Sequence, residues 1–226
     1  MNEFDNIYNT DEYRRFTAQK EENISDLCRE ERTIPFDLGY SLWCGEYAHR
    51  TDNGRSYRCR LFSPEGKLIF GYTLYHNILE NDAVKLLSAP DGLYFFYLEG
   101  LYGYSVLRLS DMAEMHYIPR GNSGESFIIT DLHYCSENRI AAVSGFHNKL
   151  DSKAESHDVA LIDLSDPIKE PEKITSLFPI VNPEHDYGRF EDLSFVRWEK
   201  GGRLIVRTDT GEEFAFNTND LRKFMD

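Results

Sequence analysis

The strongest constraint on the fold is a weak internal repeat. An acidic residue that opens an apolar run recurs four times, at intervals of 45, 49 and 61 residues: Asp37-Leu38, Asp82-Ala83, Asp131-Leu132 and Asp192-Leu193. Self-similarity at such a period is typical of architectures in which each repeat is one supersecondary unit packed on its neighbours. We therefore expect four units, which cover residues 37–81, 82–130, 131–191 and 192–226.

Inside these units, short apolar runs alternate with turn signals. Pro90-Asp91-Gly92 precedes the run 93–98, and Lys200-Gly201-Gly202 precedes the run 203–206. The chain holds 14 tyrosines and 15 phenylalanines, and aromatic residues suit the half-buried surfaces of pleated sheets. Many short strands separated by turns predict an all-β fold.

Four strands in a unit of about 45 residues resemble one blade of a β-propeller. The resemblance covers residues 37–226 and rests on pattern, because the Gly-His and Trp-Asp dipeptides of WD40 repeats and the Gly-Gly pairs of kelch repeats do not recur. It implies a small or open propeller-like arrangement of about four blades. A β-sandwich stays open as the alternative.

Residues 11–32 are expected to form an N-terminal helix. Tyr13, Phe16 and Ile24 lie on a thin apolar stripe with helical spacing, and Pro35 ends any continuation. We therefore predict a helical extension over residues 1–36 and a β domain over residues 37–226.

Composition and charge exclude several functional classes. The net charge is −14, from 39 acidic and 25 basic residues, which disfavours contact with the phosphates of nucleic acids or with an anionic membrane. The four cysteines form no CxxC motif, and no run of 18 apolar residues occurs. We expect a cytoplasmic protein with reduced thiols.

A propeller-like fold would place most loop insertions on one face, and such a face often binds a partner. The predicted binding residues in these loops are His49, Arg50, Tyr102, Arg120, His147, His185, Asp186 and Arg189. Polar residues also gather in loops for solvation alone, so solvent exposure is the competing interpretation.

The recurrent acids Asp37, Asp82, Asp131 and Asp192 would surround the mouth of a central channel. Carboxylates in a ring could bind a divalent cation, whereas isolated aspartates at strand starts commonly cap turns. The same ring supplies the candidate catalytic residues Asp82, Asp131 and Asp192, to which the loop residue His185 is added.

The sequence contains no GxSxG, HExxH, P-loop or GxGxxG motif. The prediction is therefore a non-enzymatic recognition module that binds a protein partner, for which the acidic surface favours a basic one. The alternative is a hydrolase or lyase that acts on a glycan or small polar substrate through the carboxylate ring. No cofactor is predicted, and a divalent cation or a small-molecule ligand stays open.

Overall fold

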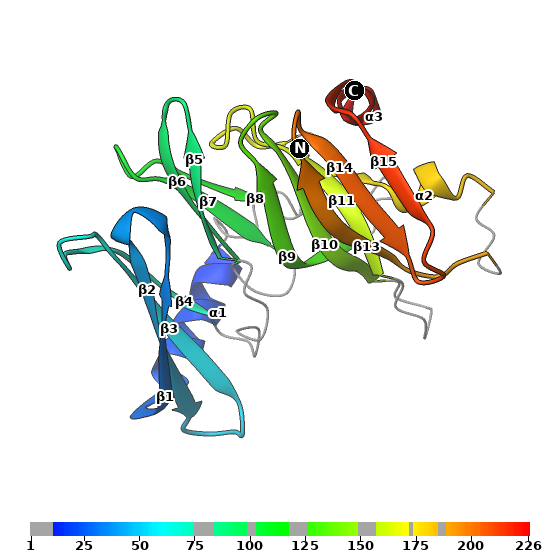
Figure 1. Ribbon diagram of the computed structural model, residues 1–226. Coiled ribbons are helices and arrows are strands. Elements are labelled where there is room, and N and C mark those ends of the chain that lie inside the picture. The colour runs from blue at the N-terminus through cyan, green and yellow to red at the C-terminus, as the bar shows by residue number, and fades with distance from the viewer. Residues whose placement is uncertain are drawn as a thin grey trace. The chain divides into compact units, whose positions relative to one another are not determined.

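The computed structural model describes residues 11–74, 84–98, 103–117, 126–148, 157–171, 174–184 and 189–226. The chain divides into two compact units. Unit 1 contains residues 1–81 with 99–101, and unit 2 contains residues 82–98 with 102–226. The described residues form four antiparallel sheets of consecutive strands (Figure 1), which confirms the predicted all-β class with an N-terminal helix.

Unit 1 contains one helix and one four-stranded sheet, in the order β1-β2-β3-β4. Its elements are α1 (Asp11–Asn23), β1 (Ile24–Pro35), the 3₁₀ turn η2 (Asp37–Gly39), β2 (Ser41–His49), β3 (Arg55–Phe62) and β4 (Leu68–Leu74). Most side chains of α1 are exposed, and an ion pair between Glu21 and Arg58 (2.6 Å) joins the helix to β3.

The N-terminal helix is shorter than the sequence predicted. It ends at Asn23, and residues 24–35 form β1, which pairs with β2 from Ile24↔His49 to Pro35↔Ser41. The side chain of Asn23 explains the end of the helix, because its Oδ1 accepts hydrogen bonds from the backbone N–H groups of Arg50 and Thr51. Residue 36, where we placed a domain boundary, lies inside unit 1 between β1 and η2.

Unit 2 contains three sheets. The first holds β5 (Lys85–Ala89), β6 (Gly92–Leu98), β7 (Tyr104–Arg108) and β8 (Glu114–Tyr117). The second holds β9 (Ser126–Cys135), β10 (Ile140–Asn148), β11 (His157–Asp163) and β12 (Thr175–Ser176), and α2 (Phe178–Val181) follows it. The third holds β13 (Leu193–Glu199), β14 (Arg203–Thr208) and β15 (Glu213–Phe216), and α3 (Thr218–Met225) follows it.

Some contacts between neighbouring sheets of unit 2 involve their first strands. Lys85 in β5 is 3.3 Å from Asp131 in β9 (Nζ to Oδ1). Further along β9, the His133 ring stacks on Phe195 of β13 with ring centroids 3.7 Å apart. Trp198 of β13 also donates a hydrogen bond from Nε1 to the backbone oxygen of His133 (2.8 Å).

A buried apolar cluster joins the last two sheets to α2 and α3. Its fully buried members include Ile140, Leu161, Leu177, Leu204 and Leu221. Burial of one such side chain contributes roughly 1.5–3 kcal/mol, so the cluster is a large source of stability for this part of unit 2. Within the described part of the chain, no helix has the length and apolar character that a membrane crossing requires.

Candidate functional site

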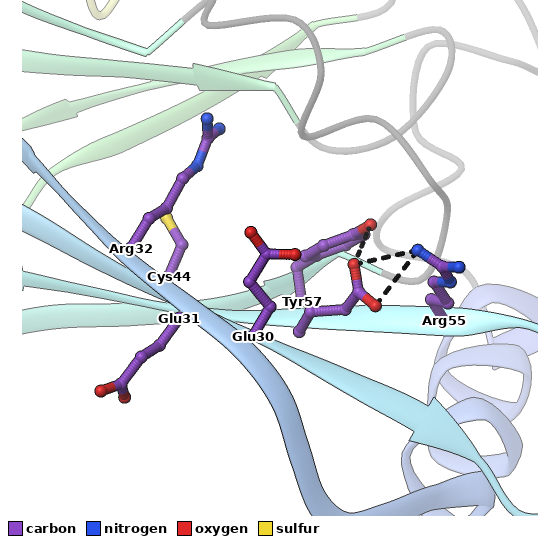
Figure 2. Close-up of a pocket in the computed structure, with 7 residues that line it drawn as sticks. Glu30, Glu31, Arg32, Cys44, Arg55 and Tyr57 are labelled. Carbon is purple, nitrogen blue, oxygen red and sulfur yellow. Dashed lines mark hydrogen bonds and ion pairs between the residues drawn. The ribbon is translucent and has the colours of Figure 1, made fainter.

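A hollow of about 220 Å³ opens on the sheet of unit 1 (Figure 2). The residues that line it are Glu30, Glu31, Arg32, Cys44, Glu46, Arg55 and Tyr57. They come from the first three strands of the sheet, so the register of these strands determines the composition of the hollow.

Two neighbouring rows of residues across the strands build the hollow. In one row, Glu30 of β1 lies opposite Glu46 of β2, and Glu46 lies opposite Tyr57 of β3. In the next row, Arg32 lies opposite Cys44. Because alternate residues of a strand face the same side of a sheet, both rows present their side chains on one face.

Glu46 is already paired inside the hollow. Its Oε2 accepts hydrogen bonds from the Tyr57 hydroxyl (3.0 Å) and from Arg55 Nη1 (3.3 Å), and its Oε1 lies 3.2 Å from Arg55 Nη1. Burial raises the pKa of Tyr57, and the hydrogen bond to the Glu46 carboxylate raises it further. Tyr57 therefore stays a neutral donor near pH 7.

Glu30 and its neighbour Glu31 differ in their surroundings. Among the described residues the Glu30 carboxylate has no hydrogen-bond or ion-pair partner, and the whole residue is exposed. Glu31 accepts a hydrogen bond from Trp43 Nε1 (3.1 Å), and Figure 2 shows its side chain pointing away from the other labelled residues. The hollow thus offers one carboxylate that can accept a hydrogen bond from a ligand.

His49, one of the predicted binding residues, belongs to a relay of hydrogen bonds at the end of β2. Its Nδ1 lies 2.8 Å from Asp52 Oδ1, and its Nε2 lies 2.8 Å from Ser56 Oγ. The order Asp-His-Ser is that of the catalytic triad of serine hydrolases. Ser56, however, is fully buried, so its hydroxyl cannot reach a substrate, and the relay fastens the β2–β3 hairpin.

Arg50 and Arg189, two further predicted binding residues, are engaged in contacts within their own units. Arg50 donates from Nε to the backbone oxygen of Ile24 (2.9 Å). Arg189 donates from Nη2 to both carboxylate oxygens of Glu212 (3.0 and 2.9 Å), and its guanidinium lies over the rings of Phe190 and Phe214.

Asp131, a predicted catalytic and metal-binding residue, lies in a polar cluster of unit 2. Its Oδ2 is 3.5 Å from His133 Nε2, its Oδ1 pairs with Lys85, and Ser144 Oγ is 3.3 Å from the same His133 nitrogen. Burial lowers the pKa of His133, the negative Asp131 opposes this effect, and the positive Lys85 adds to it. The sequence did not indicate His133 or Lys85 as part of this site.

The other acids of the predicted ring have separate environments. Asp192 Oδ1 accepts a hydrogen bond from the backbone N–H of His157 (2.8 Å), and Asp37 is exposed in η2 of unit 1. In the ranges that the structure describes, no group of three or more His, Cys, Asp or Glu side chains could hold a metal ion. Asp82, Tyr102, Arg120, His185, Asp186 and the side chain of His147 lie outside the described residues.

Comparisons with known proteins add little to these observations. No protein-family model and no curated protein matches the chain. A solved structure described as the crystal structure of the eukaryotic initiation factor aligns with 12% sequence identity and a TM-score of 0.39. The alignment covers 86% of this chain and 53% of that one, so the chain spans about half the length of that structure. A TM-score this low supports no inference about fold or function.

Proposed function

We propose that the chain is a non-enzymatic recognition module, in which the hollow of unit 1 binds a basic side chain of a protein partner. The observation that carries this proposal is the exposed Glu30 carboxylate, which has no hydrogen-bond or ion-pair partner among the described residues. A lysine or arginine that entered the hollow would form a charge-assisted hydrogen bond with Glu30, a class of bond stronger than one between neutral groups.

The charges around Glu30 favour the entry of a single basic side chain into the hollow. The Glu46 carboxylate, in the same row, is held by Arg55 and Tyr57. Arg32 and Arg55 also line the hollow and would repel a second cation. The net charge of −14 would speed the encounter with a basic partner, an effect that salt screens.

In this proposal the three sheets of unit 2 are neighbouring blades of an open propeller-like arc. The support is the contact between first strands in unit 2, because a propeller places the first strand of each blade nearest its axis. Lys85 with Asp131, and His133 with Phe195, join β5 to β9 and β9 to β13. We also propose the reducing cytoplasm as its location, since all four cysteines carry thiols.

One observation favours a second candidate, a hydrolase or lyase that acts on a small polar substrate. Asp131, His133 and Lys85 lie together, and their side chains are 41%, 22% and 38% exposed. Asp131 would be the general base of such an enzyme. Asp131→Asn would then abolish turnover of a substrate from a glycan panel, while unchanged binding of a basic peptide would separate the two functions.

The recognition proposal can be tested with an amidated hexalysine peptide as the probe. Titration calorimetry at low salt should show binding to the full chain, and Glu30→Gln should weaken it by up to about 5-fold, because an exposed ion pair contributes up to about 1 kcal/mol. Glu31→Gln is the matched control. It removes the same charge from the same strand, but the Glu31 carboxylate already accepts a hydrogen bond from Trp43. Equal losses in both variants, or no binding at all, would refute the proposal.

A further inference from the structure

Two cysteines lie directly opposite each other in the sheet of unit 1. Cys44 of β2 and Cys59 of β3 are partners in the antiparallel register, and each side chain is about 1% exposed. Residues opposite each other in antiparallel strands have Cα atoms about 4.5–5.5 Å apart, which lies within the range of about 4.4–6.8 Å that a disulfide requires. The pairing of the two strands therefore brings the cysteines within the Cα separation that a disulfide requires.

The two thiols are also in contact. A hydrogen bond joins them, and this bond and burial raise the pKa of the Cys59 thiol well above its ordinary value. Cys59 thus stays protonated and donates toward Cys44. Cys44 lines the hollow, so a small oxidant in the hollow would meet its sulfur first.

The residues on either side of the pair complete a row across all four strands. Arg32 lies opposite Cys44 on β1, and Tyr72 lies opposite Cys59 on β4. Both Arg32 and Tyr72 act to lower the pKa of Cys59, against the larger effects of burial and Cys44. A guanidinium beside a thiol pair favours the thiolate, which is the nucleophilic form of cysteine.

The other two cysteines have no such counterpart. Cys28 of β1 lies opposite Tyr47, and its Sγ contacts the backbone oxygen of Glu30 (3.4 Å). Cys135 lies in unit 2 opposite Ile140. These two cysteines therefore provide controls on the same chain.

We propose that Cys44 and Cys59 are a redox-active dithiol, which a peroxide converts to a reversible cross-strand disulfide. The Cys44 thiol gives up its proton as its sulfur attacks one peroxide oxygen, the O–O bond breaks, and the departing hydroxide takes up a proton in its place to become water. Cys44 is then a sulfenic acid. The Cys59 sulfur attacks the Cys44 sulfur, the S–O bond breaks, and the oxygen leaves as a second water with the Cys59 proton. Two thiols and one hydrogen peroxide thus give one disulfide and two waters.

The test is peptide mapping of the full chain after treatment with hydrogen peroxide, followed by alkylation of the remaining thiols under denaturing conditions. Before alkylation, the intact mass should fall by two hydrogen atoms. After alkylation, Cys28 and Cys135 should carry the alkyl group, and one linked peptide pair should contain Cys44 and Cys59. Dithiothreitol should restore all four alkylation sites. This result does not depend on whether the hollow binds a partner.

Variants distinguish this pair from other routes of oxidation. The mass loss should persist in Cys28→Ser and Cys135→Ser and disappear in Cys59→Ala. Mapping of the unaltered chain decides the matter even where a variant folds poorly. Four alkylated cysteines after peroxide treatment, a linkage that involves Cys28 or Cys135, or accumulation of a Cys44 sulfinic acid without a linked pair would each overturn the proposal.

Discussion

Arg222 Nη1 lies 2.6 Å from Asp163 Oδ2, and this ion pair joins helix α3 to the end of strand β11. The same guanidinium donates from Nη2 to the backbone oxygen of Asn138 (2.7 Å) and to Ser165 Oγ (3.0 Å). Burial by itself would raise the pKa of Asp163, but the hydrogen bonds from Arg222 and Ser165 lower it below its ordinary value. One arginine thus connects the last helix to the end of β11, to the turn between β9 and β10, and to the loop after β11.

Arg222→Met should destabilise unit 2 while it keeps most of the aliphatic stem. The expected loss in the free energy of unfolding is about 1–3 kcal/mol, since the substitution removes hydrogen bonds from a charged donor and leaves their acceptors without it. Urea unfolding at pH 7 measures this loss. Lys223→Met on the same helix is the control, because Lys223 is exposed. A loss of similar size in the control would mean that the ion pair contributes nothing specific.

The stability of unit 2 should fall as the pH drops below about 6.5, because burial lowers the pKa of His133 in the folded state. A histidine whose pKa is lower in the folded state than in the unfolded state binds a proton more readily when the chain is unfolded. Its stabilising contribution is therefore complete above the unfolded pKa and is lost as the pH falls through the folded value. His133→Gln should flatten the dependence of the melting temperature on pH between about 7.5 and 5.5.

Titration of His133 by NMR gives an independent check on the same site. Asp131→Asn should lower the pKa of His133 further, and Lys85→Met should raise it, since Asp131 favours the imidazolium and Lys85 opposes it. His157, which is exposed, serves as the reference histidine. Shifts in the same direction for both variants would contradict the assigned contacts.

The sequence predicted four groups of short strands, because turn residues and apolar runs are local signals, but two of the predicted unit boundaries were misplaced. The first sheet begins at β1, before residue 37, and the boundary at 130/131 falls inside β9. The predicted run 93–98 lies within β6, and the run 203–206 lies within β14. The strand β1 was missed for a physical reason. It is an edge strand, and edge strands often carry charges that prevent pairing with other chains. The segment 28–32, which contains two arginines and two glutamates, therefore has the composition of an exposed helix.

The hollow could not be predicted for a related reason. Glu30 and Glu46 are brought together by the β1–β2 register, and that register depends on the turn at η2, where Leu38 adopts a left-handed backbone with φ of 61°. A leucine carries no sequence signal for such a turn. Asp131 was predicted at the start of an inner strand, whereas it lies in the middle of β9. Its partner His133 lies two residues further along the same strand, and Lys85 comes from β5 of the neighbouring sheet, a contact that no local signal predicts.

Gly145→Ala should destabilise the chain strongly. A Cβ at this position in β10 would lie 2.1 Å from the backbone oxygen of Ile128 and 2.6 Å from the Phe127 ring, so the backbone of β9 would have to move. The expected loss is about 1–3 kcal/mol or more, as for other overpacked sites. Thermal and urea unfolding measure it. Gly71→Ala is the matched control within a strand, since its nearest contact would be 3.4 Å away. A milder effect at Gly145 than at Gly71 would argue against the tight approach of β9 and β10.

Asn23→Ala should release α1 from the sheet of unit 1 without unfolding that sheet. The Asn23 side chain accepts hydrogen bonds from the backbone of Thr51 (2.9 Å) and from its hydroxyl (2.8 Å), and it donates to Asp52 (3.2 Å). Loss of about 1.4 kcal/mol from this network would speed local opening roughly tenfold. Hydrogen exchange of the peptide 11–23 should accelerate accordingly, while the strands of the sheet keep their protection. Gln19→Ala, an exposed position on the same helix, should change neither. If hydrogen exchange of this peptide is the same in Asn23→Ala as in the unaltered chain, the ion pair between Glu21 and Arg58 holds α1 to the sheet instead.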